Sequence, residues 1–106
     1  MAYSTDLDSR VGEIATAWGA QRRAMFGGTC YLLNGNMMGG VHENRLILRV
    51  GPSYEGLLAE PGVVPFDITG RPMRGWVMVE PERYEAEGVE SWLCRAREYT
   101  ETLPPK

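Results

Sequence analysis

Residues 30–50 read CYLLNGNMMGGVHENRLILRV and contain two turn signals set between apolar runs. Asn34-Gly35 is the strongest two-residue hairpin signal, because a type I′ turn needs a positive φ at both of its central residues. Glu43-Asn44 is a weaker candidate for a second turn of the same length. The stretch therefore predicts three consecutive antiparallel strands joined by two tight turns.

The two turns set a register, and the register assigns each side chain to one face of the sheet. The predicted pairs are Leu32 with Met37, Tyr31 with Met38, Cys30 with Gly39, His42 with Arg45, Val41 with Leu46, Gly39 with Leu48 and Met38 with Arg49. One face is wholly apolar and is expected to lie under helices; it holds Cys30, Leu32, Met37, Val41, Leu46, Leu48 and Val50. The other face is mixed, as in an antiparallel sheet open on one side; it holds Thr29, Tyr31, Leu33, Met38, His42, Arg45, Ile47 and Arg49.

Helical patterns flank this meander in the sequence. The first has an apolar stripe of helical period, with Thr5 as the expected N-cap and Gly19 as the stop; its members are Leu7, Val11, Ile14, Ala15 and Trp18. A short helix is expected within 53–60, an edge strand at 63–66, a strand at 74–80 and a helical region from Pro81 that Gly88 interrupts. The predicted fold is α+β with two layers. An antiparallel sheet of about four to five strands carries the N- and C-terminal helices and a short middle helix on one face, in a single domain spanning 1–106.

Composition and charge exclude several classes of protein. The 106 residues carry a net charge of −3, which argues against a dedicated nucleic-acid binder. No apolar run approaches the roughly 20 residues of a membrane helix, and the polar N-terminus does not resemble a signal peptide. We therefore expect a cytoplasmic protein without a membrane segment.

Residues that could carry catalysis or bind a metal are scarce. Cys30 and Cys94 are far apart in the sequence, and His42 is the only histidine. This spacing matches neither a redox pair nor a zinc site. The clustered glutamates near the C-terminus, Glu82, Glu85, Glu87 and Glu90, are best explained as a solvated helix face. The sequence predicts neither an enzyme nor a bound cofactor.

The open face of the predicted sheet is the main candidate for function. Its apolar and basic side chains belong to types that are enriched at protein interfaces, and the expected contact residues are Tyr31, Met38, Arg45, Ile47, Arg49 and Trp76. A homodimer built on this face is the simplest assembly. The alternative is that a loop, or the turn at 67–72, covers the face and completes the core. If the face is an interface, Arg49→Glu or Met38→Asp should weaken assembly and leave the fold intact.

A second hypothesis is a site for a small ligand or phosphate. Glycine pairs allow close approach to the backbone, and arginines suit carboxylates and phosphates. The candidate residues are Arg22, Arg23, Gly27, Gly28 and Arg71. Strand bulges and close packing are the more common explanation of such glycine pairs.

Three stretches resemble the TfoX (Sxy) N-terminal-domain family. They are MFGG at 25–28, NGNM at 34–37 and FDITGRPMRGWV at 66–77, and the C-terminal pattern of WL at 92–93 and LPPK at 103–106 also fits. The resemblance implies a two-layer fold with an antiparallel sheet. It also implies an association with regulators of natural competence, which act with a transcription activator and carry a second, helical domain. We expect a regulatory domain whose partner is either transcription-related or a second copy of the chain.

Overall fold

The computed structural model describes residues 4–25, 28–67 and 70–106. Within these ranges six strands form one antiparallel sheet in the order β1-β2-β3-β4-β6-β5. The strands are β1 (Gln21–Met25), β2 (Gly28–Leu33), β3 (Asn36–His42), β4 (Arg45–Arg49), β5 (Val63–Pro65) and β6 (Trp76–Val79). The helices are α1 (Thr5–Ala17), α2 (Tyr54–Leu58), α3 (Pro81–Glu87) and α4 (Val89–Thr100), with a 3-10 turn η1 (Gly51–Ser53) before α2. The predicted α+β fold is confirmed, although the sheet has more strands than expected.

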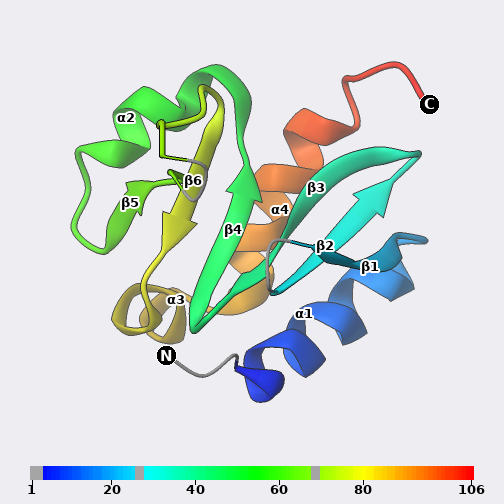
Figure 1. Ribbon diagram of the computed structural model, residues 1–106, viewed down its shortest axis with the longest axis horizontal. Helices are drawn as coiled ribbons and strands as arrows, with labels where there is room; N and C mark the ends of the chain where they lie inside the picture. The colour runs from blue at the N-terminus through cyan, green and yellow to red at the C-terminus, as the bar shows by residue number, and fades with distance from the viewer. Residues whose placement is uncertain (1–3, 26–27, 68–69) are drawn as a thin grey trace.

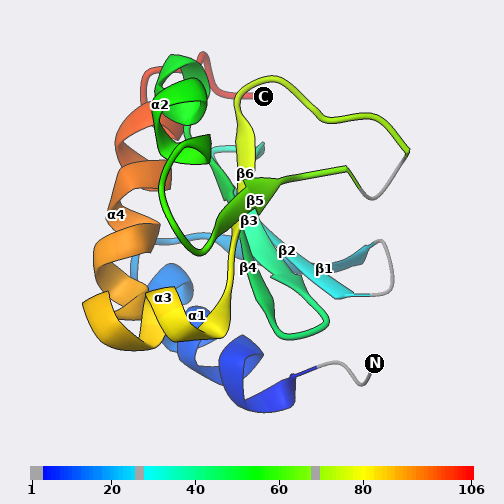
Figure 2. The same cartoon turned by 90° about the vertical axis from the view of Figure 1, so that its left-hand side faces the viewer.

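The helices cover one side of the sheet and leave the other side without a helical layer (Figures 1 and 2). The core between the two layers joins side chains from α1, α4 and the central strands; its fully buried members include Leu7, Val11, Met38, Val41, Leu46, Leu48, Trp92 and Leu93. At about 25 cal/mol per Å² of apolar surface removed from water, this contact supplies the main driving force for folding. We call the uncovered side the open face.

The start of α1 differs from the prediction by one residue. Ser4, rather than Thr5, is the N-cap, because its Oγ accepts a hydrogen bond of 3.1 Å from the backbone N–H of Leu7. Asp6 and Asp8 lie in the first turn, where the helix dipole favours negative charge. At the other end, Gly19 adopts the expected left-handed conformation with a φ of 91°.

Both predicted turns of the meander are present. Asn34 and Gly35 have φ angles of 55° and 81°, as a type I′ turn requires. The second turn, at Glu43 and Asn44, gives the predicted pairs of His42 with Arg45, Val41 with Leu46 and Gly39 with Leu48. In the first hairpin Leu32 pairs with Met37 as predicted, but Tyr31 pairs with Gly39 and Cys30 with Gly40.

A one-residue bulge at Met38 causes this difference. The register shifts between Tyr31 and Leu32, so Met38 has no partner on β2 and becomes an extra residue on β3. A Cβ at Gly39 would overlap the carbonyl oxygen of Ile47, which explains why the residue next to the bulge is glycine. Because side chains alternate along a strand, one extra residue exchanges the two faces.

The bulge corrects the predicted faces of the first hairpin. Tyr31, Leu33 and Met38 lie in the helix-covered core, not on the open face. Their neighbours in the sequence turn to the other side, where Met37 packs against a second buried cluster formed by Ile47, Phe66, Trp76 and Met78. The assignment of Leu46, Leu48 and Val50 to the helix-covered core is correct.

Candidate interaction face

Four side chains form a row across the open face, which we call the open-face row: Leu32, Met37, Arg49 and Trp76. Leu32 of β2 pairs with Met37 of β3, and Arg49 of β4 pairs with Trp76 of β6. Arg49 links the two pairs, since its Nη1 donates a hydrogen bond of 3.3 Å to the carbonyl oxygen of Met37. Its guanidinium carbon also lies 5.5 Å from the centroid of the Trp76 ring, within the range of a cation–π contact.

The half of the face over β4 and β6 is covered. Ile47, Phe66, Trp76 and Met78 form a second buried cluster that is separate from the helix-covered core. Phe66 follows β5, and its ring centroid lies 5.5 Å from that of Trp76. The backbone N–H of Met73 then bonds to the carbonyl oxygen of Phe66 at 3.1 Å, which holds this connection over the sheet. Figure 2 shows the connection between β5 and β6 on the side opposite to the helices.

The predicted contact residues therefore fall into three groups. Tyr31 and Met38 are 1% and 0% exposed under the helices, so neither can belong to an exposed face. Ile47 and Trp76 are on the open face but buried against Phe66 and Met73 of the connection between β5 and β6, as the alternative interpretation expected for part of the surface. Arg45 and Arg49 lie on the open face and are half-buried. Sequence reasoning missed Leu32 and Met37, because the bulge that exposes them was not foreseen.

The residues of the small-ligand hypothesis are not gathered into one site. Arg22 and Arg23 lie on β1, at one edge of the sheet, whereas Arg71 lies in the connection between β5 and β6 at the other edge. Arg22 is engaged with Asp8, at 2.7 Å between Nη2 and Oδ2. Gly28 is at the start of β2, where a Cβ would overlap the carbonyl oxygen of Val41, so close strand packing accounts for it. Gly27 lies outside the described residues.

Asp8 is a buried carboxylate that sequence reasoning did not single out. Its Oδ1 accepts hydrogen bonds from the hydroxyls of Thr29 and Tyr31, at 2.7 and 2.8 Å, and its Oδ2 accepts two from Arg22. Burial and the neighbouring carboxylate raise the pKa of the Tyr31 phenol above its ordinary value. These contacts join α1 to β1 and β2, so we assign Asp8 a structural role.

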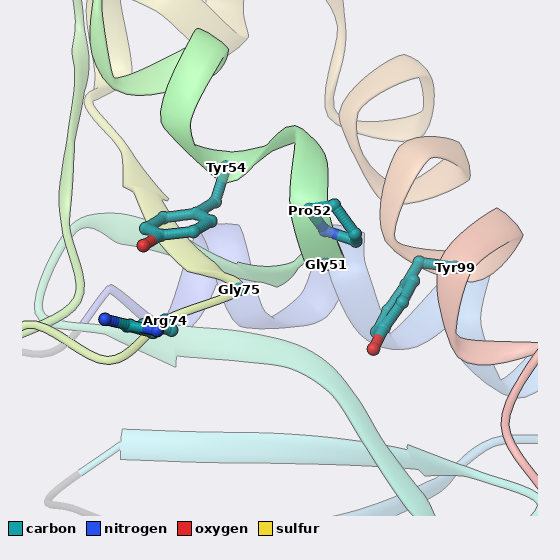
Figure 3. A pocket seen from close by; sticks show the side chains of 6 residues that line it. All are labelled: Gly51, Pro52, Tyr54, Arg74, Gly75 and Tyr99. Carbon is teal, nitrogen blue, oxygen red and sulfur yellow. The ribbon is translucent and has the colours of Figure 1, made fainter.

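A pocket of about 220 Å³ lies at the end of β4, where η1 begins. Its walls come from η1, α2, α4 and the residues before β6, and Figure 3 shows Tyr54 and Tyr99 on either side of Pro52, with Arg74 below Tyr54. The backbone N–H groups of Val50 and Gly51 both bond to the carbonyl oxygen of Gly75, which closes the floor. Gly51 cannot carry a larger side chain, because its φ is 67° and a Cβ would overlap the Tyr99 ring.

Among the described ranges, no group of three or more His, Cys, Asp or Glu side chains could hold a metal ion. None of the helices within those ranges is long and apolar enough to cross a membrane.

The sequence model of the TfoX N-terminal domain matches residues 14–99, about four fifths of the chain. The chain belongs to the TfoX N-terminal domain family. Comparison with the curated proteins gives no match, and comparison with the solved structures gives none either. The resemblance noted from three sequence stretches is thus confirmed.

The stretch that carries most of the TfoX resemblance, residues 66–77, supplies part of the open face. Phe66 and Trp76 from this stretch pack against each other, and Met73 packs beside them. The NGNM stretch at 34–37 makes the turn of the first hairpin and ends at Met37 in the open-face row. Two of the three stretches of this TfoX domain therefore meet on one side of the sheet.

The two cysteines of the TfoX domain differ in their surroundings, and we expect this to affect stability in alkali. Burial raises the pKa of the Cys30 thiol from 9.0 to about 11, although Arg23 partly opposes the shift. The folded state therefore keeps a proton that the unfolded state loses. The stabilisation is complete below pH 9 and is lost as the pH rises towards 11, by about 2 kcal/mol. Urea unfolding at several pH values between 8 and 11 measures the loss.

Cys30→Ala should reduce this loss, and Cys94→Ala, at a partly exposed position, is the matched control. Tyr31 adds a further loss above pH 10 in all three proteins, because its pKa is also raised. An equal decline in the wild type and in Cys30→Ala between pH 9 and 10 would contradict the assignment.

Proposed function

We propose that this TfoX N-terminal domain is a non-catalytic regulatory module that binds a protein partner through the open face. The open-face row carries the proposal. It places the half-buried apolar side chains of Leu32 and Met37 beside an arginine that is held against a tryptophan. Methionine, tryptophan and arginine are enriched at protein interfaces, and binding energy concentrates in a few such residues.

Family membership supports the regulatory part of the proposal. The family is named for a competence regulator, and we propose a transcription-related protein as the partner. A second copy of the chain is the simplest other occupant. A two-fold contact through the open face would, however, bring the arginines of the two copies towards each other, so we favour a different protein.

The proposal is tested by capturing partners from a native lysate with tagged chains. Met37→Asp and Arg49→Glu should each reduce recovery of the main partner about tenfold, because one interface residue of this type contributes about 1–2 kcal/mol. Ala17→Asp serves as the matched control, since Ala17 is an exposed residue of α1 on the helical side. Quantitative mass spectrometry of the captured proteins gives the ratio.

Circular dichroism should show that all three variants remain folded. Equal recovery by the wild type and by both open-face variants would rule out the open face as the binding surface. Sedimentation of the wild type at several concentrations identifies a second copy as the occupant if the mass doubles.

A further inference from the structure

The charges of the chain are divided between its two layers. The four helices hold nine carboxylates and four arginines: Asp6, Asp8, Glu13, Glu55, Glu82, Glu85, Glu87, Glu90 and Glu98, with Arg10, Arg83, Arg95 and Arg97. Strands β1 to β4 and β6, with the loops that flank them, hold the opposite excess: Arg22, Arg23, Arg45, Arg49, Arg71 and Arg74 against Glu43, Asp67 and Glu80. The net charge of −3 for the whole chain does not reveal this separation of charge between the two layers.

The arginines of the helical layer are mostly neutralised within the molecule. Arg10 forms a bidentate pair with Glu85, with bonds of 2.8 and 3.0 Å. Arg83 pairs with Glu60 and Glu87, and Arg97 pairs with Glu101 at 3.1 Å. These positive charges are already paired and offer little to a partner.

On the open face the pattern is different. Arg45 pairs with Glu80 at 2.9 Å, whereas within the described part of the chain Arg49 has a hydrogen bond only to a carbonyl oxygen and lies against the Trp76 ring. Arg23 lies on the same side. It pairs with Cys30 of β2, which directly precedes Tyr31, and Tyr31 faces the helices. Because side chains alternate along a strand, Cys30 and its partner Arg23 face the open side. Neither arginine has a carboxylate within ion-pair distance among the described residues. The same holds for Arg71 and Arg74, which lie in the connection between β5 and β6.

We infer that the partner presents an acidic and apolar segment to the open face. This inference rests on the proposed function and names the chemistry of the partner. Leu32 and Met37 would contact apolar side chains of the segment, and Arg49 and Arg23 would receive its carboxylates. Arg23 on β1 and Arg49 on β4 are three strands apart, about 15 Å at a strand spacing of about 4.8 Å, so carboxylates at both ends of a short extended segment can reach them. Arginine suits this role because it binds carboxylates in a bidentate manner.

Two features favour an acidic protein segment over a nucleic acid. Trp76 is 7% exposed and its ring contacts both Arg49 and Phe66, so it offers no free face on which a base could stack. The acidic helical layer also repels a long polyanion, and the apolar half of the row has no partner on a phosphate backbone. The open face carries apolar side chains between two arginines, and this arrangement matches a segment that combines carboxylates with apolar side chains.

The test uses a fluorescent peptide of about 12 residues that carries Glu residues at both ends and Leu and Trp between them, which in extended form is longer than the width of the six strands. Matched peptides carry Gln or Lys in place of every Glu, and a single-stranded DNA of random sequence is the fourth probe. Fluorescence anisotropy measures binding to the full chain at salt concentrations of about 20 and 200 mM. The variants are Arg49→Glu and Arg23→Glu, with Arg95→Glu on α4 as a control that changes the net charge equally.

The Glu peptide should bind at least about fivefold more tightly than the Gln peptide, and the Lys peptide should not bind. Affinity for the Glu peptide should fall about tenfold at the higher salt concentration and about tenfold in each open-face variant, but not in Arg95→Glu. Equal affinity for the Glu and Gln peptides would overturn the inference. If Met37→Asp also lowered both affinities, the open face would still be a binding surface and the proposed function would stand. Tighter binding of the DNA, or no binding of any peptide, would also overturn it, whatever the capture experiment shows.

Discussion

Replacing Met38 with aspartate should unfold the protein. Met38 is 0% exposed and lies in the helix-covered core. A carboxylate there would be surrounded by apolar side chains, and an unpaired buried charge costs about 3–5 kcal/mol or more. Because small domains are stable by only about 5–15 kcal/mol, we expect loss of the cooperative thermal transition, or a melting temperature lowered by about 20 °C. Circular dichroism during heating measures the change.

Met37→Asp is the matched control, because the two methionines are adjacent in the sequence and lie on opposite sides of the sheet. Met37 is partly exposed at the open face, so its replacement should cost about 1 kcal/mol or less. Similar stability of the two variants, or the reverse order, would mean that the bulge in β3 is absent. The comparison therefore tests the register of the first hairpin directly. It also corrects the expectation that Met38→Asp leaves the fold intact.

Removing the buried carboxylate of Asp8 should have the next largest effect. Asp8→Ala removes the carboxylate that accepts hydrogen bonds from the buried hydroxyls of Thr29 and Tyr31, although Tyr31 keeps a longer bond of 3.3 Å to the backbone carbonyl oxygen of residue 8. Loss of a hydrogen bond to a charged group costs about 1.5–3 kcal/mol, while Arg22 is half-exposed and can be solvated. We expect a loss of about 3 kcal/mol in the free energy of unfolding, measured in urea.

Asp6→Ala is the control for this variant. Asp6 lies in the same helical turn, its side chain is 86% exposed, and its distance of 3.8 Å to Arg10 indicates a weak surface pair. Its replacement should change stability by less than about 0.5 kcal/mol. Tyr31→Phe combined with Asp8→Ala should cost less than the sum of the two single changes, because both remove the same hydrogen bond. Full additivity would show that Asp8 does not stabilise the Tyr31 hydroxyl.

The elements of this fold could be predicted because their signals are local. The Asn34-Gly35 turn, the Gly88 break between α3 and α4 and the apolar stripe of α1 depend only on neighbouring residues. The register of the second hairpin followed from its turn, since a two-residue loop leaves little freedom in strand pairing. The same reasoning placed Leu46 and Leu48 in the core correctly.

The candidate site was harder to predict because it depends on one long-range irregularity. Nothing in the local sequence distinguishes Met37 from Met38, and the bulge at Met38 is visible only in how β3 pairs with β2 and β4. Strand β1 was missed for a related reason. Its residues Gln21, Arg22 and Arg23 have no apolar alternation, and the strand forms by pairing with β2.

The edge strands of the sheet, β1 and β5, also determine how readily copies of the chain aggregate at high concentration. An edge strand presents unpaired N–H and C=O groups that can template the addition of another chain. Here β5 has only three residues and ends in Pro65, which lacks an N–H group, and β1 carries Arg22 and Arg23 in adjacent positions. Both edges therefore discourage strand-by-strand growth into fibres. The part of the open face around Leu32 and Met37 can therefore stay exposed without strands of other copies adding at the sheet edges.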